Sequence, residues 1–361
     1  MINVTEPFLP PFDEYVSYLS GIWKRNWLTN NGPLLNELEL RLKETLGVEH
    51  LLVTGNGTLA LQIAIKALGL EGEIITTPFS YIATTSSVIW ESCQPVFADI
   101  NEQTFNIDPG EVEKKITSKT TAILTTHVFG NASEVKQLQN IATKHDLKII
   151  YDAAHCFGVK YGNQPIMEYG DINCLSLHAT KLFHTIEGGA IVSKSSDLIY
   201  RASKMRNFGH HGEGIFDGIG INGKNSEFHA AMGLCNLKYL QDILTSRREQ
   251  YRYYKDKLSG SQVKFQQLTD EEGYNYSYFP VVFENENTLL KVRKELEDHY
   301  IYPRRYFYPS LSCLDYVEKH STPISDSVSK RVLCLPMFHS LSKEDQDLVV
   351  RVILRTLRYK G

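Results

Sequence analysis

The chain has 361 residues, a formal net charge of −4 and 42% hydrophobic residues, which is the composition of an ordinary globular protein. No basic block and no apolar run of membrane-spanning length is present, so nucleic acid and membranes are not expected partners. The N-terminus lacks the features of a signal peptide, and the six cysteines are scattered without CxxC pairs. We therefore expect a cytoplasmic protein without a metal site or a disulfide framework.

From about residue 50 the chain alternates short apolar runs with helical segments. Strands are predicted at 50–55, 73–78, 95–100, 120–130 and 147–155, and helices at 58–70, 81–92, 108–116 and 133–146. This alternation predicts an α/β fold with a mostly parallel central sheet and helices on both faces. In such sheets ligands bind at the carboxyl ends of the strands.

The pattern changes after residue 225. One long helix is predicted at 226–258, with Ser226 as its N-cap. A strand at 277–283, a helix at 286–299, an aromatic loop at 300–311 and a last helix at 343–359 complete a smaller α+β unit. We place a boundary near residue 246, which gives a large domain at 1–246 and a small C-terminal domain at 247–361.

Four features near predicted strand ends carry candidate chemistry. TGNGTLA at 54–60 is a turn that leads into a helix, where backbone N–H groups can hold phosphate or can simply form a turn. Asp152 ends a buried strand, where a carboxylate either pairs with a protonated nitrogen or caps the next helix. Ser176 and His178 alternate on one face, although both could satisfy backbone groups. Lys181 follows them, and the tight sequence EGG comes next.

Together these residues match the needs of pyridoxal 5'-phosphate. That cofactor needs a phosphate-binding turn, a carboxylate that keeps its pyridine nitrogen protonated, and a lysine for covalent attachment. An aromatic ring must also stack on it, and Tyr81 follows the second strand, although alone it could be an ordinary rim aromatic.

Beyond these features, the sequence resembles the DegT-type nucleotide-sugar aminotransferases, which are pyridoxal phosphate enzymes of fold type I. The resemblance runs from WLTNNGPLLNELE through GNGTLAL, PFSYIATT, YDAAH, GDINCLSLHATK and EGGAIV to GINGKNSEFHAAMGL. It implies that Lys181 forms the Schiff base and Asp152 binds the pyridine nitrogen. The other residues that it implies for cofactor binding are Gly57, Thr58, Tyr81, His155, Ser176 and Asn222.

In the family, the asparagine that corresponds to Asn222 reaches the phosphate of the neighbouring subunit, so the resemblance implies a homodimer with shared active sites. The sequence departs from the family at Asn225, where methionine is usual, and this departure concerns local packing more than chemistry. A lysine at 181 favours transamination, because the related dehydratases have histidine there.

The resemblance also implies L-glutamate as the amino donor and a nucleotide-linked keto-sugar as the acceptor. The pattern favours dTDP-4-dehydro-6-deoxy-D-glucose, aminated at C4 for O-antigen synthesis; a C3 keto-sugar, a UDP- or GDP-linked sugar, and a non-catalytic regulator remain alternatives. The expected substrate-side residues are Trp27, Thr29, Arg304, Arg305, Tyr306 and Tyr308. The two arginines could instead pair with local carboxylates.

Overall fold

The computed structural model describes residues 1–358, and a seven-stranded sheet forms its centre. In spatial order its strands are β2 (Leu51–Thr54), β10 (Gly189–Val192), β9 (Ile172–Ser176), β6 (Lys148–Asp152), β5 (Thr120–Thr126), β3 (Glu73–Thr76) and β4 (Gln94–Phe97). Only β10 runs antiparallel to its neighbours in this sheet. The predicted α/β class with a mostly parallel sheet is confirmed.

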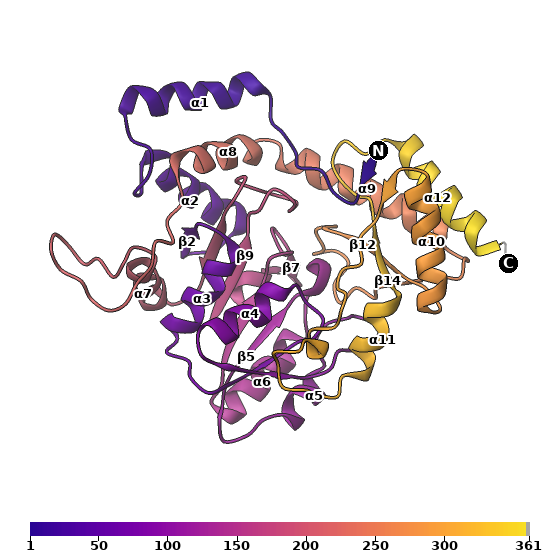
Figure 1. The fold of residues 1–361 in the computed structure, drawn as a ribbon. Coiled ribbons are helices and arrows are strands. Elements are labelled where there is room, and N and C mark those ends of the chain that lie inside the picture. The colour runs from indigo at the N-terminus through magenta and orange to yellow at the C-terminus, as the bar shows by residue number, and fades with distance from the viewer. Residues whose placement is uncertain (359–361) are drawn as a thin grey trace.

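Helices cover both faces of the sheet (Figure 1). One face packs against α3 (Gly57–Ala67), α4 (Ile82–Trp90) and α7 (Ser196–Met205), and the other against α2 (Pro33–Leu46), α5 (Pro109–Lys114), α6 (Val135–His145) and α8 (Glu227–Leu237). Neighbouring strand residues alternate between the two hydrophobic clusters; Leu52 belongs to one and Val53 to the other. Because both faces are buried, the strands are apolar throughout, as expected for a parallel sheet.

The single helix predicted at 226–258 is wrong, because the chain forms α8 and then α9 (Leu240–Leu258). The break falls at Lys238 and Tyr239, whose backbone N–H groups donate to Cys235 and Asn236, a tighter turn than the α-helical one. Both side chains bind Glu14 of α1 (Phe12–Arg25), which lies along α8 in Figure 1. This polar contact between distant segments has no local sequence signal.

Three further points compare the predicted helices with those of the structure. Helices α1 and α2 occupy a region for which no element is predicted. Ser226 stands at the N-cap of α8, but its hydroxyl bonds to the His229 ring rather than capping the helix. The last helix, α12, is described as Lys343–Arg358, and the predicted end at Tyr359 lies outside the described residues.

A second hydrophobic cluster lies beyond the sheet and packs around a three-stranded antiparallel sheet. Its elements are β11 (Lys264–Phe265), β12 (Phe279–Val282), β14 (Val332–Leu335), α10 (Glu286–Asp298) and α12, with α11 (Pro323–Arg331) nearby. Helix α9 spans both parts, because Ile243 packs in the large cluster and Tyr254 in the small one. The boundary at residue 246 falls inside this helix and stays a prediction.

Short elements complete the fold. The N-terminal β1 (Ile2–Asn3) pairs in parallel with β13 (Ile301–Tyr302), so the first residues pack on the C-terminal unit. The strands β7 (Lys160–Tyr161) and β8 (Gln164–Pro165) form a small hairpin. Across residues 1–358 no helix has the length and apolar character needed to span a membrane.

Gly233 gives a test of the packing between α8 and α2. A Cβ there would lie 2.8 Å from Thr185 Cγ2 and 2.9 Å from Leu38 Cδ1, so Gly233→Ala should overpack this contact. We expect a loss of about 1–2 kcal/mol of unfolding free energy in urea, although alanine favours helices. Gly21→Ala in α1 is the control: its Cβ meets only the flexible end of Arg25, and it should stabilise slightly. A stabilising Gly233→Ala would contradict the packing.

Candidate active site

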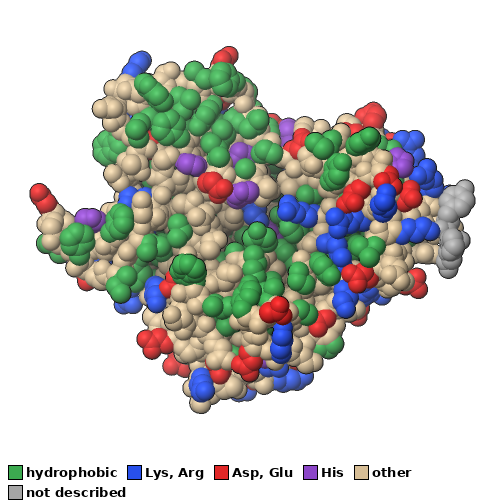
Figure 2. Space-filling model, in the orientation of Figure 1, with side chains coloured by type: hydrophobic (Ala, Val, Ile, Leu, Met, Phe, Trp, Pro, Cys, Tyr) green, Lys and Arg blue, Asp and Glu red, His purple; other side chains and the backbone are tan. Residues whose placement is uncertain are grey.

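A cavity of about 680 Å³ opens at the carboxyl ends of the central strands. Asp152, Ser176 and Thr126 are the last residues of β6, β9 and β5, and all three line it. In Figure 2 histidine and charged side chains gather near the centre of the face drawn. The predicted residues that line this one cavity are Gly57, Thr58, Tyr81, Asp152, His155, Ser176, Lys181, Arg304 and Tyr306.

Asp152 is a buried carboxylate whose position depends on neighbouring hydroxyls. It accepts hydrogen bonds from Thr84 Oγ1 at 2.7 Å and from the N–H of Ala154 at 3.1 Å. Ser80 Oγ connects Thr84 Oγ1 to Thr126 Oγ1, each at 2.7 Å. Burial raises the pKa of Asp152, and these hydrogen bonds and the charge of Lys181 oppose the rise.

Within residues 1–358 no basic side chain forms an ion pair with Asp152. A buried carboxylate is costly unless a positive charge compensates it. A protonated pyridine nitrogen in the cavity would supply that charge, so the donor set here fits pyridoxal phosphate. Thr84 and Ser80 were not predicted; their spacing in SYIATT carries no signal without knowledge of the neighbouring strand.

Lys181 lies in the loop that joins β9 to β10, where its N–H donates to His178 O at 2.9 Å. Burial lowers the pKa of its amine, and the charges of Asp152, Tyr306 and Tyr81 oppose this change. A lowered pKa increases the fraction of neutral, nucleophilic amine at a given pH. The side chain therefore has the chemical character needed to bond an aldehyde.

The turn into α3 has the geometry of a phosphate-binding site. Asn56 caps the helix by accepting from the N–H of Leu59 at 2.8 Å, and the N–H groups at 57 and 58 begin the first turn, where helices lack internal partners. A Cβ on Gly57 would lie 3.1 Å from Ser176 Cβ, so the two residues are adjacent. A Cβ on Gly189 would lie only 2.4 Å from Asn56 O, which explains the need for glycine in EGG.

His155 is buried and its tautomer is determined by the backbone. Its Nδ1 accepts from the N–H of Phe129 at 3.2 Å, and its ring is parallel to that of Phe307 at 5.9 Å. Burial, together with the charge of Lys181, lowers its pKa well below the usual value. The neutral ring therefore carries its proton on Nε2, which can donate to an oxygen in the cavity.

Only some of the predicted substrate-side residues of the aromatic loop at 300–311 line the cavity. Arg304 and Tyr306 line it, whereas Arg305 and Tyr308 do not. Arg305 donates to Glu286 at 2.7 Å and stacks on Tyr308 at 3.6 Å, which is the local pairing considered as the alternative from the sequence. The ring of Tyr81, 58% exposed, stands at the N-terminus of α4 where a flat cofactor could stack.

Trp27, Thr29 and Asn222 lie outside the cavity lining of this single chain. Thr29 Oγ1 donates to Asn225 O at 3.4 Å, and Asn222 is exposed and bridges to Asn207. Asn225, the departure from the family, is buried, and its amide donates to Glu187 O at 3.1 Å. This hydrogen bond connects the segment at 222–227 to the EGG turn at 187–189.

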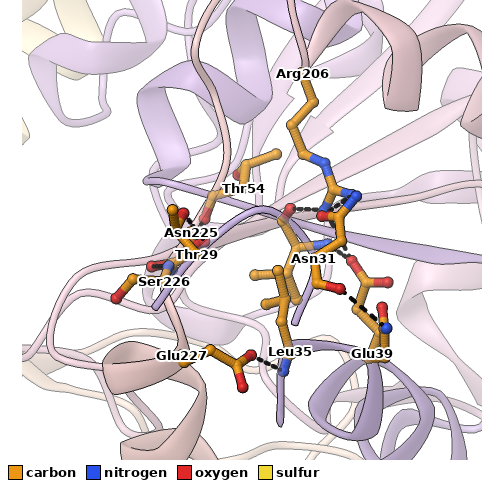
Figure 3. Close-up of polar contacts among 11 residues, drawn as sticks. Thr29, Asn31, Leu35, Glu39, Thr54, Arg206, Asn225, Ser226 and Glu227 are labelled. Atoms are coloured by element: carbon orange, nitrogen blue, oxygen red, sulfur yellow. Dashed lines mark hydrogen bonds and ion pairs between the residues drawn. The ribbon is translucent and has the colours of Figure 1, made fainter. Parts of the chain in front are cut away.

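A polar network holds the segment at 27–33 in place (Figure 3). Arg206 donates to Glu39 at 2.9 Å and to Asn31 Oδ1 at 3.0 Å, and its side chain is buried. Glu227 accepts from the N–H groups of Leu34 and Leu35 at 3.0 and 2.9 Å and so caps α2 from α8. These contacts hold the segment at Asn31 and at the start of α2.

The fold and this cavity define a pyridoxal-phosphate-dependent aminotransferase. The sequence profile of the DegT/DnrJ/EryC1/StrS aminotransferase family matches residues 13–354, and the chain belongs to this family. It is similar to dTDP-4-amino-4,6-dideoxy-D-glucose transaminases of Shigella dysenteriae (40% identity) and Escherichia coli (37%), each over 98% of both chains.

A similar solved structure is that of DesI in the presence of its TDP-sugar product. It has a TM-score of 0.93 and 31% sequence identity, and the match covers 99% of this chain and 93% of that one. The agreement in fold over nearly the whole chain supports the assignment to the family.

The charges around Lys181 give a test by pH titration. Because the charge of Asp152 raises the pKa of Lys181, Asp152→Asn should lower that pKa further. The measurement is an NMR titration of ¹³C-methylated lysines in cofactor-free protein, with Lys181→Met identifying the signal. The other lysine signals serve as the control. An unchanged or raised pKa of Lys181 in Asp152→Asn would contradict the described arrangement.

Proposed function

We propose that this protein transfers the amino group of L-glutamate to dTDP-4-dehydro-6-deoxy-D-glucose. The products are dTDP-4-amino-4,6-dideoxy-D-glucose, a precursor for O-antigen synthesis, and 2-oxoglutarate. The observation that carries the aminotransferase chemistry is the convergence of Lys181, Asp152 and the α3 turn on one cavity. The choice of sugar is supported by the two transaminases that align over 98% of the chain.

In this proposal the chain's residues hold the cofactor and move protons. When bound, pyridoxal phosphate supplies an electron-accepting ring that stabilises negative charge on a substrate carbon. The N–H groups of Gly57 and Thr58 and the hydroxyl of Ser176 would bind its phosphate, and Asp152 its ring nitrogen. His155 Nε2 would donate to its phenolic oxygen, with Tyr81 stacked on the ring.

Lys181 has two roles in the proposal. Its Nζ would hold the cofactor covalently between turnovers and, once released, would take the proton from the α-carbon of glutamate. Burial favours this second role, because it lowers the pKa of the amine and so increases the fraction of neutral base at a given pH. The hydroxyl chain from Thr84 to Thr126 would keep Asp152 ionised while the positive ring nitrogen is present.

The direct test separates the two half-reactions. Glutamate should bleach the yellow protein, and after removal of glutamate the keto-sugar should restore the colour and yield a sugar aminated at C4 by NMR. Lys181→Ala should lower turnover by about 10³-fold or more, because the variant lacks both the amine that takes the proton from glutamate and the group to which the cofactor attaches. Lys194→Ala, a surface lysine paired with Glu168, is the matched control. Full turnover by Lys181→Ala would refute the proposal.

We further propose a cytoplasmic homodimer with shared active sites. The segment between α7 and α8 extends away from the body of the molecule in Figure 1 and exposes Phe208, Ile215, Phe216 and Ile219. Several exposed apolar side chains on one projecting segment favour a protein interface there. Asn222 stands at the base of this segment, and a second subunit could receive it near the cofactor phosphate.

A complementation experiment tests the shared site. Lys181→Ala and Asn222→Asp dimers, each inactive alone, are unfolded together and refolded as a mixture. If Asn222 acts in the partner's site, hybrids contain one intact site, and roughly a quarter of wild-type turnover should return by random assortment. If Asn222 acts in its own site, every site of the hybrid carries one substitution and activity stays absent, which would contradict the proposal.

A further inference from the structure

Arg304 is an uncompensated cation on the cavity wall. It lines the cavity and is exposed, and across residues 1–358 its guanidinium makes no ion pair or side-chain hydrogen bond. The neighbouring Arg305 differs, because its charge is neutralised by Glu286. An arginine that faces a substrate cavity without a carboxylate partner is available to bind an oxyanion from solution.

Backbone hydrogen bonds hold Arg304 in place, although its guanidinium has no ionic partner among residues 1–358. The N–H of Arg304 donates to Cys334 O at 3.1 Å, and the N–H of Cys334 donates to Arg304 O at 2.8 Å. These two bonds attach Arg304 to β14 of the small sheet. Its guanidinium carbon lies 5.3 Å from the centre of the Tyr306 ring. Stacking on an aromatic face orients a guanidinium while its N–H groups remain free to donate in the plane.

Tyr306 contacts Arg304 and lines the same cavity as Lys181. Burial raises the pKa of Tyr306 to about 12, and the charges of Arg304 and Lys181 both oppose that rise. Lys181, Arg304 and Tyr306 line one cavity, and the charges of both cations act on the phenol. A substrate that reacts at Lys181 brings its nearest charged groups to this part of the cavity.

The other charged groups of the cavity already have roles. Lys181 and Asp152 are assigned to the cofactor, and Glu187 lies 3.4 Å from His178. Among the lysines and arginines of residues 1–358 that line the cavity, Arg304 is the one left for a substrate. The amino donor brings two carboxylates into the same space, and burying them without a cation would be costly.

We propose that Arg304 binds a carboxylate of the amino donor and determines the preference for a dicarboxylic amino acid. This inference rests on the proposed function, since it requires an amino-acid donor. The donor is favoured over the sugar diphosphate because its carboxylates lie on the short chain whose α-carbon Lys181 deprotonates. The diphosphate is separated from C4 of the sugar by the pyranose ring, which places it farther from Lys181.

The first measurement is binding without turnover. Glutarate, a dicarboxylate that lacks the amino group, is titrated calorimetrically into the cofactor-loaded wild type and variants. In Arg304→Gln the Kd for glutarate should rise roughly 10-fold or more, as expected for the loss of a charge-assisted bond, with partial recovery in Arg304→Lys. Arg331→Gln removes a partly buried arginine of the same unit that lies outside the cavity lining and is paired with Glu102, and should leave the Kd unchanged.

The second measurement compares single half-reactions by loss or return of the yellow colour. Arg304→Gln should slow the reaction with glutamate roughly 10- to 100-fold and leave the reaction of the aminated form with the keto-sugar unchanged. L-Alanine as donor identifies the carboxylate. If only glutamate is slowed, Arg304 binds the distal carboxylate, as the inference requires. If alanine is slowed as much, Arg304 binds the α-carboxylate and does not determine the preference for a dicarboxylic donor, which contradicts that part of the inference.

Three results of the binding and rate measurements would overturn the inference. They are an unchanged glutarate Kd together with an unchanged glutamate rate, a loss confined to the keto-sugar half-reaction, and an equal loss in both half-reactions. Failure of the proposed function has a different signature, since glutamate would then not bleach the wild-type protein. Loss of the yellow colour in Arg304→Gln before any substrate is added would also overturn it, because Arg304 would then support the cofactor.

Discussion

The active site depends on the cost of burying a carboxylate. Asp152 is 6% exposed at the end of a central strand, where its charge has little contact with water. Thr84 and Ala154 donate to it and offset part of that cost, while burial still raises its pKa. The remaining cost is relieved when a cation occupies the cavity beside it. The same cavity contains Lys181, whose pKa is lowered by burial, so one cofactor that bonds to the lysine and pairs with Asp152 would satisfy both buried groups.

The architecture brings these groups together through close backbone packing. The strand ends, the turn into α3 and the EGG turn approach so closely that side chains on Gly57 or Gly189 would meet neighbouring residues. Helix α9 belongs to both hydrophobic clusters, and so links the central sheet to the unit that supplies Arg304 and Tyr306. In the proposed function, the residues that would bind the cofactor come from the large sheet and its loops, and those that would bind the substrates come from both units. This separation is suited to an enzyme that binds two different substrates at one cofactor.

Much of the fold and of the candidate site could be predicted, because the signals are local. Strands of a parallel sheet are buried on both faces, so they appear in the sequence as apolar runs. The residues that end these runs, such as Asp152, are therefore expected at the carboxyl ends of the strands, where ligands bind. The break between α8 and α9 could not be predicted, since it coincides with contacts to Glu14, more than two hundred residues away in the chain. Likewise, only the folded structure shows that Arg305 pairs with Glu286, whereas Arg304 has no ion pair among residues 1–358.

The central claim is that Lys181 is the residue to which pyridoxal phosphate attaches. Borohydride reduction of the yellow protein fixes the cofactor to whichever lysine carries it, and peptide mass spectrometry then locates the added pyridoxyl phosphate. We expect the modification on the peptide that contains LSLHATK, at Lys181, in close to one copy per chain. A modification on another lysine, or none on a protein that remains yellow before reduction, would contradict the account.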